Sequence, residues 1–192
     1  MQERQVTTEG QTRPLPRPFL LLATQNPVEL EGTFPLPEAQ LDRFLMRVVI
    51  GYPSQEEENR ILERFHKDDP LPRLEAVCSP AEIIALQAQR GTVRVEDSVR
   101  DYIVRIVRVT RGNEDIQLGA SPRAALALYQ SSQAWAALAG RDYVLPDDIK
   151  TMAPHVLGHR LMIAPQAQLR GRTVSELIED IVKAVPVPVE NG

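Results

Sequence analysis

Residues 19–27 read Phe19-Leu20-Leu21-Leu22-Ala23-Thr24-Gln25-Asn26-Pro27, four apolar side chains followed by a polar turn. A short run of this kind is typical of a buried strand, and strands that are apolar throughout are typical of parallel sheets. In open α/β sheets, ligands bind beyond the carboxyl ends of the strands. The run therefore predicts a parallel strand that delivers the amide of Asn26 to a nucleotide site.

The composition of the chain argues against several classes of protein. The 192 residues carry 26 acidic and 22 basic side chains, and the resulting net charge of −4 does not attract nucleic acid. No apolar stretch reaches the roughly 18 to 20 residues that a membrane span needs. The first residues lack the charged-then-apolar order of a secretory signal. We expect a cytoplasmic protein with neither nucleic acid nor membrane as a partner.

The first third of the chain mixes predicted strands with predicted helices. Apolar runs at 19–22 and 46–50 predict two strands, and Gly10 between Thr-containing segments predicts a small hairpin. Residues 37–44 predict a short helix before the second strand. The expected fold class of residues 1–69 is therefore a partial α/β core that holds the C-terminal strands and helices of a parallel sheet.

A further helix is predicted at the end of this α/β portion. Ser54 and Glu57 have the spacing of a capping box, in which each side chain accepts a hydrogen bond from the other residue's backbone. Ile61, Leu62 and Phe65 then fall on one face and are expected to be buried. Beyond this helix two prolines and weak periodicity indicate a linker.

Residues 70–192 predict an all-α domain. Ser79, Ser121 and Thr173 each stand where a helix N-cap is expected, and Ser79 and Ser121 are followed by proline. Helix stops are expected at Gly112 and Gly140. The positions expected in the core are Val99, Ile103, Ile106, Val107, Leu128, Trp135, Leu138, Leu177, Ile178, Ile181 and Val182.

The predicted nucleotide site is incomplete. Nothing in the 192 residues resembles the Gly-rich phosphate loop that ends in Lys-Ser or Lys-Thr. The residues that would hold phosphate and magnesium are therefore absent from this sequence.

Several separated strings carry a family resemblance. They are Leu22-Ala23-Thr24-Gln25-Asn26-Pro27-Val28-Glu29, Glu31-Gly32-Thr33-Phe34-Pro35-Leu36-Pro37-Glu38-Ala39-Gln40-Leu41-Asp42-Arg43-Phe44, Gly51-Tyr52-Pro53-Ser54, Gly119-Ala120-Ser121-Pro122-Arg123-Ala124, Gly140-Arg141-Asp142-Tyr143-Val144 and Leu157-Gly158-His159-Arg160-Leu161. Together they resemble the MoxR family of AAA+ ATPases over most of residues 1–165, and the last three resemble that family's helical lid. The resemblance begins after the family's phosphate loop and its Asp-Glu strand, which implies the C-terminal part of such an ATPase.

The resemblance implies a role for Asn26 as sensor 1, the amide that hydrogen-bonds the terminal phosphate or the attacking water. An uncharged amide suits this role because it can donate to phosphate oxygen and accept from water. The alternative is that Asn26-Pro27 only forms a turn.

The resemblance also implies that Arg43 is an arginine finger that faces the neighbouring subunit. A guanidinium is always charged and can contact two phosphate oxygens at once. The alternatives are an ion pair within the chain, with Asp42 or Glu38, or a solvated surface charge. If Arg43 is a finger, the function requires an oligomer.

By the same resemblance, Arg123 is sensor 2, which binds nucleotide and reports it to the lid. It is expected as the second residue of a helix, where free amides and the helix dipole attract anions. The alternative is an arginine on a solvated first turn.

Two other groups of residues have side chains that could form a site. His155 and His159 stand four apart, a spacing that could bind zinc, but no third ligand of suitable type lies near them in the sequence. Glu29, Glu31 and Glu38 could form paired carboxylates, although three carboxylates on a loop are more often solvated. We expect no metal ligands among these residues.

The function that the resemblance implies is ATP binding and hydrolysis, with ATP and Mg²⁺ as cofactors, in chaperone-like remodelling or maturation of protein complexes. It also implies a hexamer and a partner that carries a von Willebrand factor A domain. Without a phosphate loop, this chain alone is expected to be catalytically incompetent. The alternative is a non-catalytic assembly or regulatory module that docks on complete subunits. A weaker third hypothesis, a nucleic-acid motor subunit, is disfavoured by the acidic balance.

Overall fold

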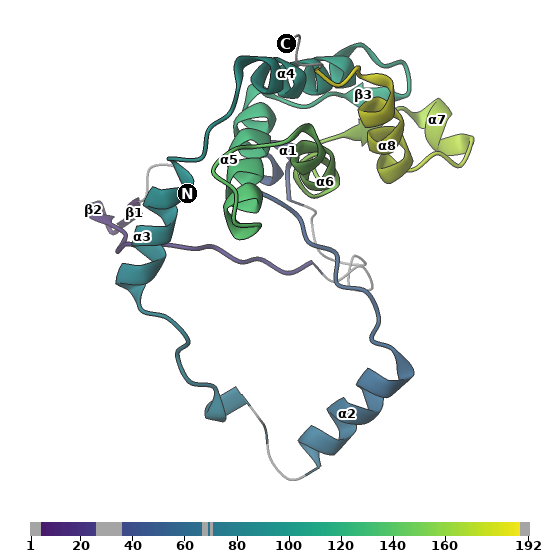
Figure 1. The fold of residues 1–192 in the computed structure, drawn as a ribbon. Coiled ribbons are helices and arrows are strands. Elements are labelled where there is room, and N and C mark those ends of the chain that lie inside the picture. The colour runs from purple at the N-terminus through teal and green to yellow at the C-terminus, as the bar shows by residue number, and fades with distance from the viewer. Residues whose placement is uncertain (1–4, 26–35, 67–68, 70, 189–192) are drawn as a thin grey trace.

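The computed structural model describes residues 5–25, 36–66, 69 and 71–188 (Figure 1). Most of the regular structure lies in the second half of the chain. The elements are β1 (Gln5–Thr8), β2 (Gln11–Pro14), α1 (Glu38–Leu41), α2 (Gln55–Phe65), a 3₁₀ turn (Leu71–Arg73), α3 (Pro80–Arg90), α4 (Asp97–Gly112), β3 (Ile116–Leu118), α5 (Pro122–Leu138), α6 (Pro146–Leu157), β4 (Met162–Ile163), α7 (Pro165–Leu169) and α8 (Val174–Ala184).

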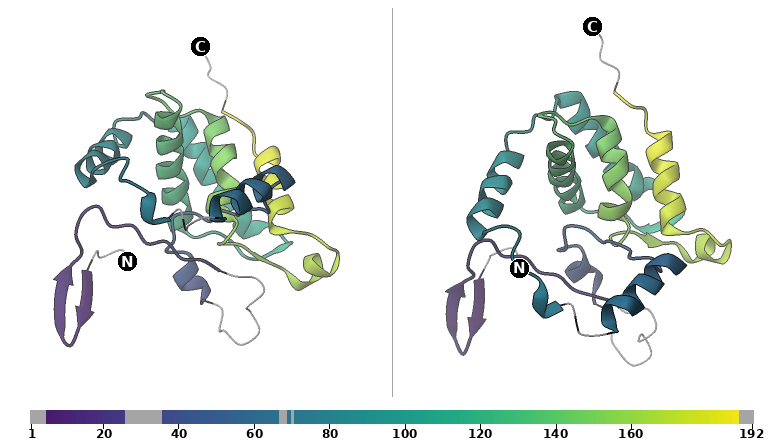
Figure 2. Two further views of the ribbon diagram at one scale, coloured as in Figure 1. Left: turned by 90° about the horizontal axis from the view of Figure 1, so that it is seen from below. Right: turned by 60° about the horizontal axis from the view of Figure 1, so that its bottom comes forward.

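The hydrophobic core of the described residues lies among helices α4, α5, α6 and α8. Figures 1 and 2 show α5, α6 and α8 side by side, and α4 packs against all three. Tyr102, Ile106, Leu128, Ile149 and Val156 are fully buried there. The positions expected to be buried on α4 and α8 are confirmed.

Two of the expected core positions on α5 are wrong. Trp135 and Leu138 are exposed, whereas Leu128 is buried as expected. Helix α5 is apolar on more than one face because it is rich in alanine and leucine, so its sequence does not show which face packs against α4 and α6.

The predicted helix starts are confirmed. Ser54, Ser79 and Thr173 each accept a hydrogen bond from the backbone of the glutamate three residues later, and that glutamate accepts from the backbone of the cap. Each pair satisfies two amides that a helix start otherwise leaves free. Helix α5 ends at Leu138, just before Gly140, whose φ of 74° favours glycine.

The predicted strands at 19–22 and 46–50 do not form. Both segments are described, and neither contains strand residues. The described strands instead form two antiparallel pairs, β1 with β2, which confirms the hairpin at Gly10, and β3 with β4. A strand inside a sheet needs neighbouring strands on both sides to bind its N–H and C=O groups, and no described segment forms a strand ladder with either of these two.

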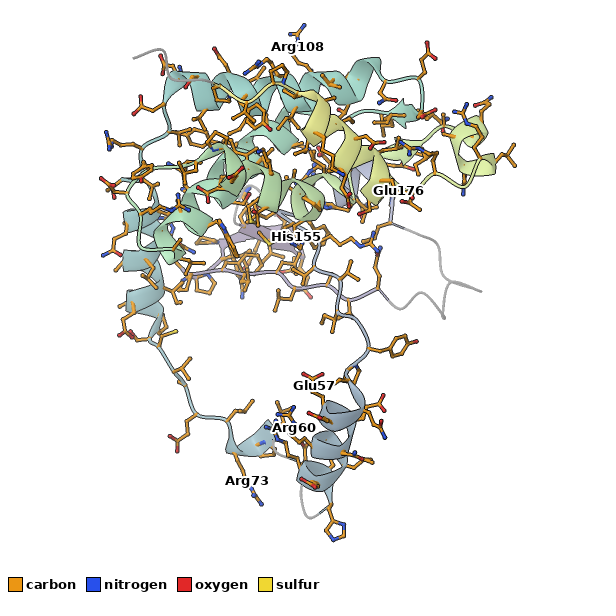
Figure 3. All side chains as sticks on the ribbon, turned by 45° about the vertical axis from the view of Figure 1, so that its right-hand side comes forward. Glu57, Arg60, Arg73, Arg108, His155 and Glu176 are labelled. Carbon is orange, nitrogen blue, oxygen red and sulfur yellow. The ribbon has the colours of Figure 1, made fainter. Side chains whose placement is uncertain are left out.

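The predicted apolar stripe of α2 is also exposed. Ile61, Leu62 and Phe65 all face solvent, although the helix and its cap form as expected. Figures 1 and 3 show α2 standing apart from the helices that make the core. A capping box stabilises a helix start locally, while burial of the stripe requires a partner surface.

The second part of the chain is not wholly helical, which corrects the expectation of an all-α domain. The short strands β3 and β4 pair with each other, and the N–H of Ala164 donates to the carbonyl of Asp115 at 2.9 Å. This pairing ties the connection after α4 to the connection after α6. Within the described ranges, no helix is both long and apolar enough to cross a lipid bilayer.

Candidate functional site

The start of α5 is fixed by contacts with α4. The N–H of Ala120 donates to Thr110 Oγ1 at 2.9 Å, and Arg111 Nε donates to the carbonyl of Ala120 at 2.8 Å. Gly119 lies so close to α4 that an added Cβ would be 2.7 Å from the Cα of Arg111. Only glycine fits at this position without a shift of the backbone. The close approach, together with the two hydrogen bonds, fixes the position of the loop that leads into α5 relative to α4.

Ser121 connects the start of α5 with a distant turn. Its hydroxyl accepts a hydrogen bond from the N–H of Arg123 at 3.1 Å, as an N-cap does. The same hydroxyl donates to the carboxylate of Asp42, whose oxygens lie 3.0 and 2.9 Å away. Asp42 directly follows α1, so Ser121 joins α5 to the turn that follows α1.

Arg160 also binds this turn. Its side chain is 2% exposed, and its Nε donates to Asp42 Oδ1 at 3.1 Å. Its two Nη atoms donate to the carbonyls of Asp42 and Leu45 at 3.2 Å each, and also to those of Phe44 and Val156. Burial lowers the pKa of Arg160, and the hydrogen bond with Asp42 opposes that shift. The guanidinium thus remains a buried cation with one carboxylate as its counter-charge. We call Asp42, Ser121 and Arg160, with the backbone of residues 42–45, the Asp42 latch.

Arg123 contacts the latch more loosely. Its Nη1 lies 3.8 Å from Asp42 Oδ2, and its side chain is 43% exposed. The structure therefore brings this expected sensor residue to the turn that carries Arg43, although 80 positions separate the two in the sequence.

Arg43 is exposed, and among the described residues it forms no ion pair with either Asp42 or Glu38. The carboxylate of Asp42 is occupied by Ser121, Arg160 and Arg123 instead. The alternative of an ion pair within the chain therefore finds no support in the described part of the structure. The third expected site residue, Asn26, lies outside the described residues.

The two histidines serve the packing of this region in different ways. The Nε2 of His159 lies 3.3 Å from the carbonyl of Phe44, and its Nδ1 is buried with no partner among the described atoms. Burial, and then the charge of Arg160, lower the pKa of His159. The side chain of His155 is exposed, while its carbonyl accepts from the N–H of Arg47 at 2.8 Å. In the part of the chain that is described, no three His, Cys, Asp or Glu side chains are arranged to hold a metal.

This arrangement offers two accessible guanidinium groups, those of Arg43 and Arg123, next to the latch. Each solvent-exposed guanidinium can bind two phosphate oxygens at once. The carboxylate of Asp42, in contrast, is already bound by Ser121 and Arg160. Sequence reasoning missed the roles of Asp42 and Arg160. No local pattern joins two residues 118 positions apart, although Arg160 stands inside one of the strings that carried the family resemblance.

Two family models match the chain in sequence. The model described as "ATPase family associated with various cellular activities (AAA)" matches residues 1–46, and the model described as "AAA lid domain" matches residues 108–181. Asn26 and Arg43 lie in the first match, and Ser121, Arg123 and Arg160 lie in the second.

Known proteins match over the whole chain. "Uncharacterized protein YeaC" of Bacillus subtilis is 48% identical over 192 residues, and "Chaperone MoxR1" of Mycobacterium tuberculosis is 39% identical over 201 residues; both matches cover 100% of this chain. "Protein MoxR" of Methylorubrum extorquens is 32% identical over 98% of the chain. This chain is homologous to the MoxR-family AAA+ ATPases. It spans 60%, 53% and 60% of the lengths of these three relatives.

A solved structure supports the same relationship. The crystal structure of a putative ATPase from Cytophaga hutchinsonii superposes with a TM-score of 0.89 at 36% sequence identity, and the match covers 98% of this chain and 60% of that one. The backbone described above therefore resembles part of a AAA+ ATPase, the helical lid included.

Proposed function

We propose that this chain supplies sensor 1, the arginine finger and the helical lid of a MoxR-type AAA+ ATPase, which binds and hydrolyses ATP to remodel or mature other protein complexes. One observation carries the proposal: the Asp42 latch joins the turn that bears Arg43 to the start of α5, which bears Arg123. Two separated arginines to which the family resemblance assigns nucleotide contacts, Arg43 with the nucleotide of a neighbouring subunit, are thereby connected through a single carboxylate.

The chemistry of the two arginines suits this role. Arg43 is exposed beside the latch and can reach a phosphate held by a neighbouring subunit, where a finger contributes about 10³- to 10⁵-fold to the rate in related NTPases. Arg123 lies in the first turn of a helix of 17 residues, where the helix dipole favours an anion. The amide of Asn26 is proposed to contact the terminal phosphate or the attacking water.

ATP and Mg²⁺ are the proposed cofactors. Arg43 and Arg123 fit the phosphates, because both guanidinium groups are accessible. The described residues do not offer a set of Mg²⁺ ligands, since Asp42 is occupied by Arg160 and no group of suitable side chains is gathered elsewhere in the described ranges. The magnesium ligands are therefore proposed to come from the phosphate-loop part of the enzyme, and this chain alone is proposed to be inactive.

The proposal extends to the assembly and the partners. A finger acts on the nucleotide of a neighbour, so the active form is proposed to be a ring of subunits, a hexamer by analogy with the family, in the cytoplasm. A protein with a von Willebrand factor A domain is proposed as its partner. We also propose that the chain divides into a core portion, residues 1–69, and a lid, residues 70–192. In the whole enzyme the core portion would complete a parallel sheet whose other strands come from the phosphate-loop part.

Arg43 provides the test of this function. The chain is mixed with an amino-terminal AAA+ segment that carries a Gly-rich phosphate loop, and ATP turnover is measured. We expect the mixture to hydrolyse ATP and the chain alone to be inactive. Arg43→Ala is expected to lower kcat by about 10³-fold or more with little change in KM. The matched control is Arg108→Ala. Arg108 is exposed on α4 and points away from the other helices (Figure 3), so this substitution should leave turnover unchanged.

The same assay separates the alternative function. A non-catalytic assembly module would raise the activity of complete subunits without forming active sites with the amino-terminal segment. Turnover that is the same in the wild type and in Arg43→Ala would discard the finger.

A further inference from the structure

The Asp42 latch physically joins the two arginines of the proposed function. Arg43 is the next residue after Asp42, and Arg123 is the second residue of α5. Arg160 binds the carbonyls of Asp42, Phe44 and Leu45 and so holds the backbone on both sides of Arg43. The place of the Arg43 turn is thereby set by contacts with the lid.

The partners of Asp42 differ in how firmly they are held. Ser121 donates at 2.9 to 3.0 Å, and Arg160 is 2% exposed and donates through Nε at 3.1 Å. Arg123 is 43% exposed and its Nη1 is 3.8 Å from Asp42 Oδ2. Exposed ion pairs contribute little, whereas breaking a buried one leaves a charge without a partner. Arg123 is therefore the partner that leaves Asp42 at the least cost.

The geometry points to Asp42 as a positioning residue for ATP hydrolysis, which fixes the Arg43 turn on the lid and competes with the nucleotide phosphates for Arg123. This inference rests on the proposed function of the two arginines. Asp42 acts through them and touches no phosphate itself. A phosphate that binds Arg123 removes one cation from Asp42, while Ser121 and Arg160 keep the turn attached to the start of α5 and to the segment that follows α6.

The first test uses the chain itself and needs no catalysis. The amide of Arg47 donates to the carbonyl of His155 at 2.8 Å, so its hydrogen exchange reports whether the turn is docked. In Asp42→Asn we expect exchange at Arg47 to be about tenfold faster, because local opening becomes easier. Asp97→Asn is the matched control, since Asp97 pairs with Arg100 at 2.9 Å on the surface of α4 and should leave Arg47 unchanged. Unchanged exchange in Asp42→Asn overturns the inference.

The second test uses turnover in the mixture described above. Asp42→Asn is expected to lower kcat about tenfold or more, with a KM for ATP that stays the same or falls because a charge that competes with phosphate for Arg123 has been removed. Partial unfolding would also lower the apparent kcat at an unchanged KM, so the folded fraction of each variant is measured by circular dichroism and kcat is expressed per folded protein. In an Arg43→Ala background the second substitution is expected to lower kcat no further, because Asp42 acts through Arg43. A further loss of kcat in that background, or a rise in KM, overturns the inference.

Two further measurements distinguish failure of this inference from unfolding of the variant and from failure of the proposed function. If Asp42→Asn is unfolded by circular dichroism, Ser121→Ala takes its place, since it keeps the charges of Asp42, Arg123 and Arg160 and removes only the hydroxyl that donates to Asp42 and accepts from the N–H of Arg123. It should accelerate exchange at Arg47 in the same direction by a smaller factor, and no change overturns the inference. If Arg43→Ala retains full turnover, the proposed function fails, while the exchange result at Arg47 still decides whether Asp42 holds the turn.

Discussion

Arg160 shows how much one buried side chain can organise. It is a cation almost without solvent contact, and every hydrogen bond that it donates among the described residues ends on Asp42 or on a backbone carbonyl. Removing the partner of such a buried charge typically costs about 3–5 kcal/mol. Lysine could not replace it, because an ammonium lacks the planar fork that reaches several acceptors at once.

The charge of Arg160 also acts on His159. The pKa of His159 is lowered by burial and by the charge of Arg160. In the folded protein His159 therefore resists the protonation that it undergoes near pH 6.5 in the unfolded chain. The contribution of His159 to stability is therefore complete above that pH and is lost as the pH falls through the folded pKa. We expect the midpoint of urea unfolding to fall between pH 7.5 and pH 5.5, and to fall less in His159→Gln. His66→Gln, at the exposed end of α2, should keep the wild-type fall; an equal fall in all three proteins would contradict the assignment.

The position of a site residue could be predicted only where its immediate neighbours in the sequence determine its local structure. Arg123 was placed correctly as the second residue of a helix because Ser121 and Pro122 precede it. The partners of Asp42 could not be predicted, since a carboxylate beside Arg43 is equally compatible with a local ion pair. Asp42 instead pairs with the buried Arg160, which lies 118 positions later. Burial of Arg160 depends on how the helices of the second half of the chain pack together.

At the scale of the element, the start of α5 depends on the absence of a side chain at Gly119. Its backbone passes so close to α4 that a methyl group would meet the Cα of Arg111 at 2.7 Å and the carbonyl of Thr110 at 2.8 Å. These are backbone atoms and cannot rotate away.

We therefore expect Gly119→Ala to lower the free energy of unfolding by about 1–3 kcal/mol, as overpacking does. The measurement is chemical denaturation followed by circular dichroism. Gly112→Ala serves as the control, because nothing lies within 4 Å of its added Cβ and its φ is not positive. If both variants are equally stable, the close approach of Gly119 to α4 is not a constraint.

Helices and strands were predicted with unequal success for a physical reason. The capping boxes of Ser54, Ser79 and Thr173 use residues three positions apart, so they form wherever the helix forms. The run at 19–22 has the composition of a buried strand, but a strand is defined by its neighbours, and the described residues provide none for it. The hairpin of β1 and β2 forms because its two strands are adjacent in the sequence.

At the scale of the whole molecule, the described residues divide into a packed bundle and segments without a core. The buried residues lie in helices α4 to α8 and in the segments next to them, while Leu22, Ile50 and Leu62 are largely exposed apolar side chains. Large exposed apolar surface of this kind marks an interaction site or an aggregation hazard. In the proposed enzyme, this surface is covered by the rest of the AAA+ core.

This division predicts the pattern of limited proteolysis. Trypsin should cleave after Arg73, in the exposed turn between α2 and α3, long before it cleaves after Arg108 within α4 (Figure 3). Both arginines are exposed, but cleavage at Arg108 requires unfolding of a helix that contributes Ile106 and Val107 to the core. Mass spectrometry of the early products identifies the cut; simultaneous cleavage at both sites would show that the bundle is not the more stable unit.

The contact between Asp42 and Arg160 also has a consequence for synthesis. A ribosome adds about 5–20 residues per second, so the 118 positions between them correspond to roughly 6–24 s of translation. During that interval the nascent turn lacks the guanidinium that later binds its carbonyls. The turn that carries Arg43 must therefore be one of the last parts of the chain to acquire its shape, whatever the speed at which its own short helix forms.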